Sequence, residues 1–348
     1  MPPRNFTSDN QAGVCPAAWQ ALLQANSVPH TPSYGDDPWT QRAADKLREL
    51  FQTDECEVFF CFNGTAANAL TIAHLVESYS SILCHEAAHI ETDECGAPEF
   101  FSNGAKILTT SGSHGKLTPD ALSTLISKRN DVHYPRPRLL SITQATEWGT
   151  LYSPREIQGL TQIAKSAGLY VHMDGARFAN AIATLNVPPA QITWQAGVDV
   201  LCFGGTKNGL LVGDAILFFN RSLAADFDRR CKQAGQLASK MRFLSAPWFH
   251  MLDTGTWLSN ARHANAMAAE LASRLQAIPG ILILHPSQAN SVFLQLPLAL
   301  ASALKSRGWN FYTFIGGGAR FMTAWDTSQE DIDQLIGDFQ ELSINSPL

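Results

Sequence analysis

The sequence contains few charged residues, no long apolar run and no closely spaced pair of cysteines. Only 16% of its 348 residues are Asp, Glu, Lys or Arg, so we expect part of the surface to be covered by another subunit. The net charge is −6 and no run of basic residues occurs, which argues against a nucleic-acid partner. No segment approaches the roughly 20 consecutive apolar residues of a membrane-spanning helix, so we expect no membrane partner.

The seven cysteines are dispersed and form no Cys-x-x-Cys motif. The N-terminal residues lack the apolar stretch of a signal peptide. Together these features predict a cytoplasmic protein with reduced cysteines. Cys202 lies on an expected strand, so we assign it to the core and not to a nucleophile.

Strands alternate with helices through most of the chain, which predicts an α/β protein with a mainly parallel sheet. The expected strands are 57–62, 81–84, 106–108, 138–143, 169–173, 198–203 and 214–219, and the expected helices are 16–25, 41–51, 65–78, 154–167 and 176–184. Ligands of such sheets bind at the carboxyl ends of the strands. We therefore look for the functional site at these ends.

The C-terminal part has a different pattern, with longer helices and short strands. We expect helices at 250–277, 297–307 and 328–342, and strands at 281–285, 292–295 and 320–324. This pattern predicts a small C-terminal α/β domain. The predicted divisions are an N-terminal arm (1–30), a large domain (31–245) and a small domain (246–348).

Two of the expected strands end on residues that suit pyridoxal phosphate (PLP). Lys207 follows Val-Asp-Val-Leu-Cys-Phe-Gly-Gly-Thr, and Asp174 follows Leu-Tyr-Val-His-Met. A lysine amine can form the Schiff base with PLP, and an aspartate can keep the pyridine nitrogen protonated, so that the ring accepts electrons. Asp174 is also suited to be a simple helix cap, and it is the pairing with Lys207 that favours the cofactor.

Further residues fit the same site. Gly64 and Thr65 lie between a strand and a helix, where free amides and the helix dipole can hold a phosphate. Arg177 lies one turn past Asp174, where its guanidinium suits a substrate carboxylate or the phenolic oxygen of the cofactor. Each of these residues alone is a weak signal.

The segment 84–97 contains two histidines and several acids. His85 and His89 are four residues apart, as zinc ligands on a helix can be. The less favoured interpretation is a zinc site, because an imidazole can also stack on a pyridine ring and move protons near it. We therefore assign no metal, give the stacking role to His89, and expect His85 to be structural.

Four other residues have no clear role from their local sequence alone. Ser8 is suited to a cap or turn, His133 to a surface loop, Tyr34 to a turn and Arg320 to an exposed charge at the start of a strand. The alternative for each is a place in the site.

Four motifs occur in a fixed order: Phe-Asn-Gly-Thr-Ala-Ala-Asn, Ala-His-Ile-x3-Glu-Cys-Gly-Ala, His-Met-Asp-Gly-Ala-Arg and Phe-Gly-Gly-Thr-Lys-Asn-Gly. This ordered set resembles the L-threonine aldolases of low stereospecificity, and L-phenylserine aldolases are similar. The resemblance covers nearly the whole chain. It implies the aspartate aminotransferase-like fold (fold type I) of PLP enzymes.

The resemblance also implies roles for individual residues. The residues it assigns to the cofactor are Lys207, Asp174, Gly64, Thr65 and His89. It assigns Ser8, Arg177 and Arg320 to the substrate carboxylate, and His133 to the substrate hydroxyl. Tyr34 and a cation, either Lys232 or Lys240, would reach the active site of a neighbouring subunit.

This chain departs from better-known members at two points. It has Gln144-Ala145-Thr146 where they have Glu-Asn-Thr, and Lys240 or Arg242 stands where they have an arginine. The sequence therefore leaves open which residue supplies the cation that binds the phosphate.

The implied activity is the reversible cleavage of L-threonine, L-allo-threonine and related L-β-hydroxy-α-amino acids, with phenylserine as a further candidate. The products are glycine and an aldehyde, and the reaction passes through a carbanion delocalised into the cofactor ring (a quinonoid). The alternative is another fold-type-I PLP enzyme, such as an aminotransferase, a β-lyase or a racemase. A third interpretation is a PLP-binding homologue without catalysis. Active sites that share residues predict a homo-oligomer, and we expect a tetramer.

Overall fold

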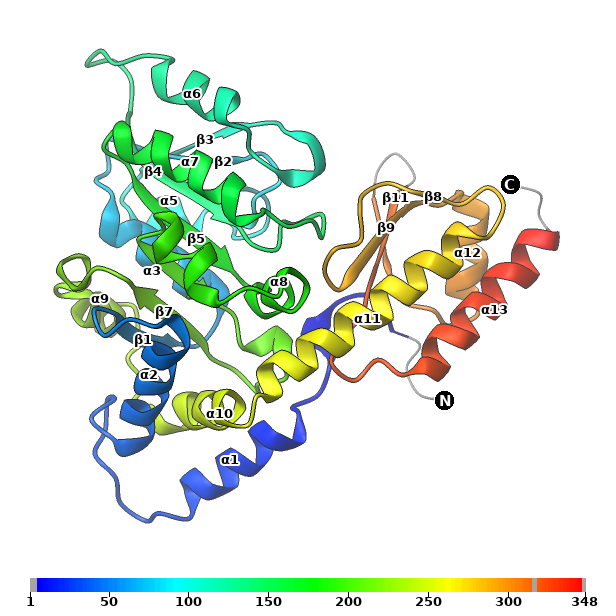
Figure 1. The fold of residues 1–348 in the computed structure, drawn as a ribbon, viewed down its shortest axis with the longest axis horizontal. Helices are drawn as coiled ribbons and strands as arrows, with labels where there is room; N and C mark the ends of the chain where they lie inside the picture. The colour runs from blue at the N-terminus through cyan, green and yellow to red at the C-terminus, as the bar shows by residue number, and fades with distance from the viewer. Residues whose placement is uncertain (1–4, 315–317, 346–348) are drawn as a thin grey trace.

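The computed structural model describes residues 5–314 and 318–345, which form two sheets with their helices (Figure 1). The larger sheet has seven strands in the order β1-β7-β6-β5-β4-β2-β3. Its strands are β1 (Glu57–Cys61), β2 (Ser80–His85), β3 (Lys106–Thr110), β4 (Arg136–Thr143), β5 (Tyr170–Gly175), β6 (Val200–Phe203) and β7 (Asp214–Phe218). Strands β2 to β6 pair in parallel, and β7 pairs antiparallel with β6 and β1. The prediction of a mainly parallel sheet is confirmed.

Helices cover both faces of this sheet. They are α1 (Pro16–Asn26), α2 (Pro38–Phe51), α3 (Gly64–Leu75), α4 (His89–Thr92), α5 (Ala97–Phe101), α6 (Pro119–Ser127), α7 (Pro154–Ser166), α8 (Phe178–Leu185), α9 (Phe227–Gln233) and α10 (Arg242–Asp253). The core on one face includes residues of α2, α7, α8 and α10, and the core on the other face includes residues of α3 and α9.

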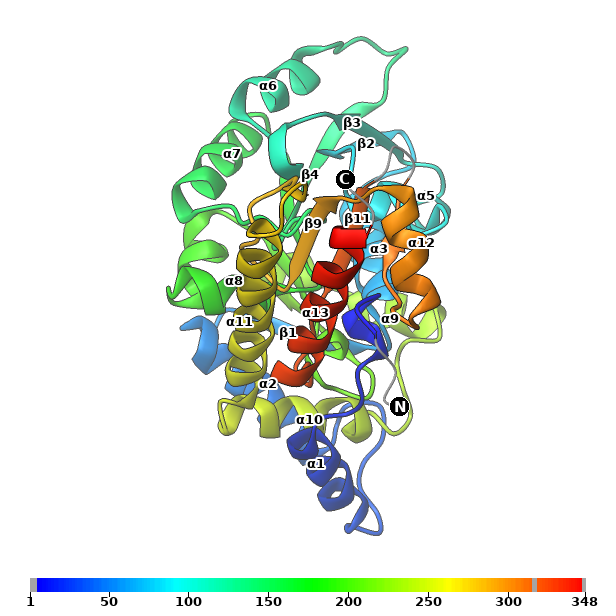
Figure 2. The same ribbon diagram turned by 90° about the vertical axis from the view of Figure 1, so that its right-hand side faces the viewer.

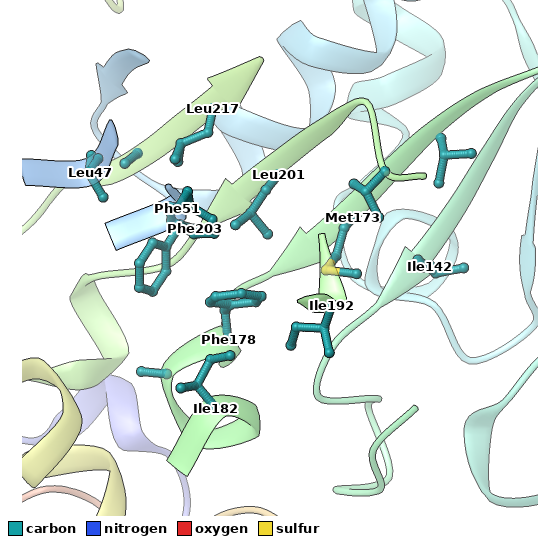
Figure 3. Close-up of a cluster of buried hydrophobic side chains, with 14 of the residues drawn as sticks. Leu47, Phe51, Ile142, Met173, Phe178, Ile182, Ile192, Leu201, Phe203 and Leu217 are labelled. Carbon is teal, nitrogen blue, oxygen red and sulfur yellow. The ribbon is translucent and has the colours of Figure 1, made fainter. Parts of the chain in front are cut away.

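Strand β6 shows how one strand serves both cores. Leu201 and Phe203 belong to one core cluster, whereas Val200 and Cys202 belong to the other, because side chains alternate across a strand. Figure 3 shows Leu201 and Phe203 among the aromatic and aliphatic side chains of their cluster. Cys202 is buried and lies in the core, as expected.

The second sheet belongs to the C-terminal part. Strands β8 (Leu282–Ile283), β9 (Ser291–Gln295), β10 (Tyr312–Thr313) and β11 (Gly318–Met322) form an antiparallel sheet in the order β10-β11-β9-β8. Helices α11 (Thr256–Gln276), α12 (Leu298–Ser306) and α13 (Gln329–Asn345) pack with it around a separate core. Figure 2 shows α11 and α13 lying along this part of the molecule. No helix of the described ranges is long and apolar enough to cross a membrane.

The N-terminal arm contacts both sheets. Phe6 is buried in the core of the second sheet, and its backbone bonds Asn310 and Met322 at 2.8 Å each. Further along, the amide of Cys15 donates to Gly209 O at 2.8 Å in the large domain. The arm therefore ties the two parts of the molecule together.

The prediction of one continuous helix at 250–277 is wrong, because the structure has two helices there. Helix α10 ends at Asp253 and α11 begins at Thr256. Gly255 between them has φ 70°, a conformation that favours glycine and ends a helix. Helix α10 packs against α1 and α2 and crosses the proposed division between residues 245 and 246, which stays a prediction.

Candidate active site

A cavity of about 240 Å³ lies at the edge where the parallel strands end. Its lining residues come from the ends of β5 and β6, the start of β7, helices α3 and α4, and the N-terminal arm. They are Asn10, Asn63, Gly64, Thr65, Asn68, His89, Asp174, Ala176, Gly204, Thr206, Lys207 and Asp214. Segments that are distant in the sequence meet here because parallel strands share one carboxyl edge.

Lys207 is held on a rigid turn directly after β6. Asp214 accepts hydrogen bonds from the backbone amides of Gly205, at 2.9 Å, and Thr206, at 3.3 Å. On the other side, Asn208 Nδ2 donates to Trp257 O at 2.7 Å. A side chain at Gly205 would place its Cβ only 2.5 Å from Leu210, so the close packing requires glycine. The turn thus fixes where the lysine enters the cavity.

Asp174 lies at the end of β5 and is bound by two donors. Its Oδ1 accepts from the amide of Ala176 at 3.0 Å, and its Oδ2 accepts from Asn68 Nδ2 at 3.0 Å. The same nitrogen of Asn68 donates to Glu94 Oε1 at 2.8 Å. Asn68 on α3 therefore bridges two buried carboxyl groups.

His89 completes this network. Its Nδ1 lies 2.8 Å from Glu94 Oε1, and the hydrogen bond to Glu94 raises the pKa of His89. Glu94 thereby orients the imidazole, as carboxylates often orient functional histidines. His89, Glu94 and Asp174 each offer a ligand atom within 4.8 Å of the others, although Asn68 already donates to both carboxyl groups.

His85 does not join His89. Its Nε2 lies 3.0 Å from Gly112 O, and its Nδ1 accepts from the amide of Ala87 at 3.0 Å. Both ring nitrogens are therefore used by the backbone. The zinc site suggested by the spacing of these two histidines is not formed, because His85 has no nitrogen left for a metal.

The start of α3 provides a site for an anion. Asn63 caps the helix, with its Oδ1 accepting from the amide of Ala66 at 2.9 Å and its carbonyl accepting from Ala67 at 3.1 Å. The amides of Gly64 and Thr65 lie in the first turn of the helix, where no helix carbonyl is placed to accept from them. Both residues line the cavity. Free amides at a helix start bind phosphate well.

Two arginines lie toward the N-terminal arm. Arg177 forms a two-pronged ion pair with Asp9, with Nε–Oδ2 at 2.7 Å and Nη2–Oδ1 at 2.9 Å. Arg320 donates from Nη2 to Thr7 O at 3.2 Å, while its buried Nε has no partner among the described residues. Burial and the charge of Arg177 lower the pKa of Arg320. An anion bound here would accept a hydrogen bond from Nε of Arg320, and its negative charge would offset the burial and the charge of Arg177.

Comparison with known proteins agrees with this geometry. Residues 5–298 match the β-eliminating lyase family. The chain is 58% identical to a low specificity L-threonine aldolase of Pseudomonas sp. and 57% identical to one of Pseudomonas aeruginosa, in each case over 97% of both chains. The structure of a threonine aldolase from Leishmania major superposes with a TM-score of 0.91, at 26% identity, and covers 97% of this chain and 99% of that one.

The chain belongs to the low-specificity L-threonine aldolase family. Its fold is the fold type I of PLP-dependent enzymes, as the motifs predicted, and the cofactor of the family is PLP.

The cavity fits this cofactor. It places an amine (Lys207), a carboxylate (Asp174) and the start of a helix (Gly64, Thr65) around one space, and these are the groups needed for the aldehyde, the pyridine nitrogen and the phosphate. A Cβ at Gly64 would lie 3.2 Å from Asp214 Oδ2. A side chain at position 64 would therefore crowd the Asp214 carboxylate at this end of the cavity.

Other residues implied by family resemblance do not reach this cavity. Tyr34 is 45% exposed, with Lys232 Nζ 4.1 Å from the centre of its ring, and Lys240 is also exposed. Ser8 caps a short helix turn, accepting from the amide of Asn10 at 3.2 Å.

His133 lies in an exposed turn before β4. Because β4 is parallel to β5, a residue before β4 lies at the edge opposite the cavity. His133 therefore does not line the cavity of its own subunit, and its place near the substrate hydroxyl stays a prediction. It can hold only if the loop reaches the cavity of another subunit.

Sequence reasoning missed several cavity residues, above all Asn68 and Asp214. Asn68 is a polar residue within an otherwise apolar helix, and that contrast was the available signal. Asp214 opens a buried strand seven positions after Lys207. Gln144 has a structural role, because its amide bonds the backbone N–H and C=O of Tyr152 at 3.0 and 2.9 Å.

Proposed function

We propose that this protein catalyses the reversible cleavage of L-threonine, L-allo-threonine and related L-β-hydroxy-α-amino acids, phenylserine among them. The products are glycine and an aldehyde. The observation that carries the proposal is the meeting of Lys207, Asp174 and the Glu94-bound His89 in one cavity, with two arginines nearby. The low specificity L-threonine aldolases identical at more than half of the positions support the same reaction.

The cofactor, when bound, supplies an electron sink for the charge left when the Cα–Cβ bond breaks. Lys207 would hold the cofactor through its amine, and the same amine would carry protons to and from Cα. Asp174, held by Asn68 and Ala176, keeps a proton on the pyridine nitrogen. Gly64 and Thr65 hold the phosphate with backbone amides and the Thr65 hydroxyl.

The amino-acid carboxylate would bind beside Arg177 and Arg320. Neither arginine lines the cavity itself, but Asn10, the neighbour of Asp9 on the arm, does. Arg320 has an unpartnered buried nitrogen, and Arg177 is held in place by Asp9. A carboxylate beside these two guanidiniums forms charge-assisted hydrogen bonds. Ser8 does not line the cavity, but it lies next to Asp9 on the arm, and its hydroxyl would be available to the same carboxylate.

The proton of the β-hydroxyl is removed with the help of His89. When His89 accepts a proton its ring becomes a cation, and the hydrogen bond to Glu94 stabilises this cation. A water between His89 and the hydroxyl, joined by His133 of another subunit, would serve both configurations at Cβ. Substitution of either histidine should then lower the rate without abolishing it, and complete loss in one of them with PLP still bound would count against a water base.

We also propose that the enzyme is a cytoplasmic homotetramer with active sites shared across a dimer interface. Among the described residues, Lys207 and His89 are the only basic side chains that line the cavity of one subunit. Both already have other proposed roles, so a phosphate dianion there would need a further cation. Lys232 or Lys240 of a neighbour would add charge there, and Tyr34 would lie beside it. The exposed Tyr34–Lys232 contact supports a role for this surface outside its own subunit.

Aldehyde release from L-threonine, L-allo-threonine, D-threonine and L-phenylserine tests the function directly. The wild type should cleave both diastereomers of L-threonine but not D-threonine, and Lys207→Ala with added PLP should lose activity. The rates rank the substrates. Visible binding of PLP without aldehyde from any substrate would move the function to an aminotransferase or β-lyase, which accumulation of pyridoxamine phosphate or a keto acid would reveal.

A further inference from the structure

Asp214 presents an acid to the part of the cavity where the phosphate should lie. The residue is 5% exposed and lines the cavity. Its Oδ1 accepts from the amides of Gly205 and Thr206 and from the Thr206 hydroxyl. Its Oδ2 has no hydrogen-bond partner in residues 5–314 and 318–345, and it lies close to Gly64, the first residue of α3. One oxygen is thus fixed and the other faces the anion site.

This arrangement raises a problem of charge. A phosphate dianion at the start of α3 would lie beside a second negative group if Asp214 were ionised. Two acids that share a buried site raise the pKa of one of them, which favours one proton held between the two. Burial already raises the pKa of Asp214, although Gly205, Thr206 and Lys207 oppose this effect.

We propose that Asp214 and the phosphate of the cofactor share one proton, so that Asp214 binds the phosphate as a hydrogen-bond donor. This proposal rests on the cofactor site proposed above. Oδ2 carries or shares the proton, while Oδ1 stays bound to the turn that bears Lys207. The same side chain therefore links the position of the phosphate to that of the reactive amine.

The proposal predicts that binding of the phosphate takes up a proton. Free pyridoxamine phosphate loses its second phosphate proton near pH 6, so above this pH the bound pair must take one from solution. The affinity for the phosphate group should then fall about tenfold per pH unit until the bound pair itself ionises. An amide at position 214 would donate its own hydrogen and remove this dependence.

The test measures how much the phosphate adds to binding. The dissociation constants of pyridoxamine phosphate and pyridoxamine are measured from pH 6 to 9 on the full-length enzyme freed of PLP. Neither compound reacts with Lys207, so the lysine chemistry does not enter. The dissociation constant of pyridoxamine divided by that of pyridoxamine phosphate should fall as the pH rises in the wild type and stay level in Asp214→Asn. Asp199→Asn, on the opposite edge of the sheet where Asp199 accepts from the Val171 amide, is the matched control and should behave like the wild type.

Three results would overturn the proposal. A level ratio in the wild type, with at least tenfold tighter phosphate binding in Asp214→Asn, would mean that Asp214 is ionised and repels the phosphate or is neutralised by another cation. Equal loss of affinity for both compounds in Asp214→Asn would mean that Asp214 only supports the Lys207 turn. A ratio near one in the wild type would remove the proposed phosphate site itself.

A second measurement needs no variant and covers the case in which Asp214→Asn does not fold. The phosphorus-31 resonance of pyridoxamine phosphate bound to the wild type should move from the protonated to the dianion position, with a midpoint well above pH 6. A resonance fixed at the dianion position from pH 6 to 9 would overturn the shared proton.

Discussion

Arg177 forms its ion pair with Asp9, a residue 168 positions earlier in the chain. Both side chains are nearly inaccessible to solvent, at 9% and 1% exposed, and Asn290 donates to the same carboxylate at 3.0 Å. Burial alone would raise the pKa of Asp9, but the charge and hydrogen bonds of Arg177 lower it overall. The pair and Asn290 thus join the N-terminal segment, the residues after β5 and the residues before β9 at one point.

Removal of one partner of this pair should be costly. Asp9→Asn or Arg177→Met leaves a buried charge without its counter-charge, and each should lower the free energy of unfolding by roughly 3 kcal/mol. The double variant should lose clearly less than the sum, as measured by urea unfolding with PLP present. The exposed pair Arg129–Asp131 is the control, where Asp131→Asn should change the free energy of unfolding far less than either variant of the buried pair. Additive losses at Asp9 and Arg177 would contradict a direct coupling.

Asn68 should prove important for cofactor binding. Asn68→Asp keeps the size of the side chain but adds a carboxyl group between Glu94 and Asp174, and it removes the shared donor. We expect PLP to bind about ten- to a hundredfold more weakly, since a buried charged partner is left unsatisfied. Titration of the enzyme with PLP measures this change.

Asn180→Asp provides the comparison for Asn68. Asn180 is also a buried asparagine on a helix, but it bonds Asn265 outside the cavity, at 2.8 Å. Its variant should change the stability of the protein and leave the PLP dissociation constant within about twofold of the wild type. Equal effects of the two variants on PLP binding would refute a specific role of Asn68.

Stability should depend on pH through His172. Burial lowers the pKa of His172 from 6.5 to about 4, so the folded protein does not take up the proton that the unfolded chain binds below pH 6.5. Its stabilising contribution is complete above pH 6.5 and is lost as the pH falls toward 4, by up to about 3 kcal/mol. The melting temperature of His172→Gln should therefore fall less between pH 7 and pH 5 than that of the wild type. The exposed His30→Gln should follow the wild type, and parallel curves for His172→Gln would rule out this contribution.

Shared active sites can be tested by mixing subunits. If Tyr34 serves a neighbour's cavity, hybrids of Lys207→Ala and Tyr34→Ala subunits contain some sites with both residues intact. Random mixing should restore about a quarter of the sites, measured as aldehyde release after unfolding and reassembly. Lys207→Ala and Asp174→Ala act in the same cavity and should not complement each other. Failure of the first mixture, with hybrids shown to form, would place Tyr34 outside the active site.

The sequence predicted the part of the site that depends on strand ends. Lys207 and Asp174 follow apolar strands, and Gly64 opens a helix after another strand, so a parallel sheet brings all three together without further information. The prediction that His89 belongs to the site was made from its sequence motif, and His89 lies in the same cavity in the structure. The seven-stranded sheet followed from the alternation of strands and helices.

Features that depend on long-range packing were not predicted. The partner of Arg177 lies in the arm, and nothing near Asp9 in the sequence indicates this pairing. Asn68 occupies a helix position that would otherwise be read as core, and its two acceptors come from different segments. His133 was assigned through its family alone, and the direction of β4 places it at the other edge of the sheet. The break at Gly255 was hidden because apolar residues continue on both sides of it.

The anchoring of Phe6 has a consequence for the order of folding during synthesis. The arm leaves the ribosome first, yet its backbone partners Asn310 and Met322 are among the last residues to be made. Asp9 likewise needs Asn290 beside it. The surroundings of Arg177 and Asp9 therefore cannot be completed until nearly the whole chain has emerged. A nascent chain that stops before residue 290 would therefore carry the Lys207 turn without a finished place for the substrate.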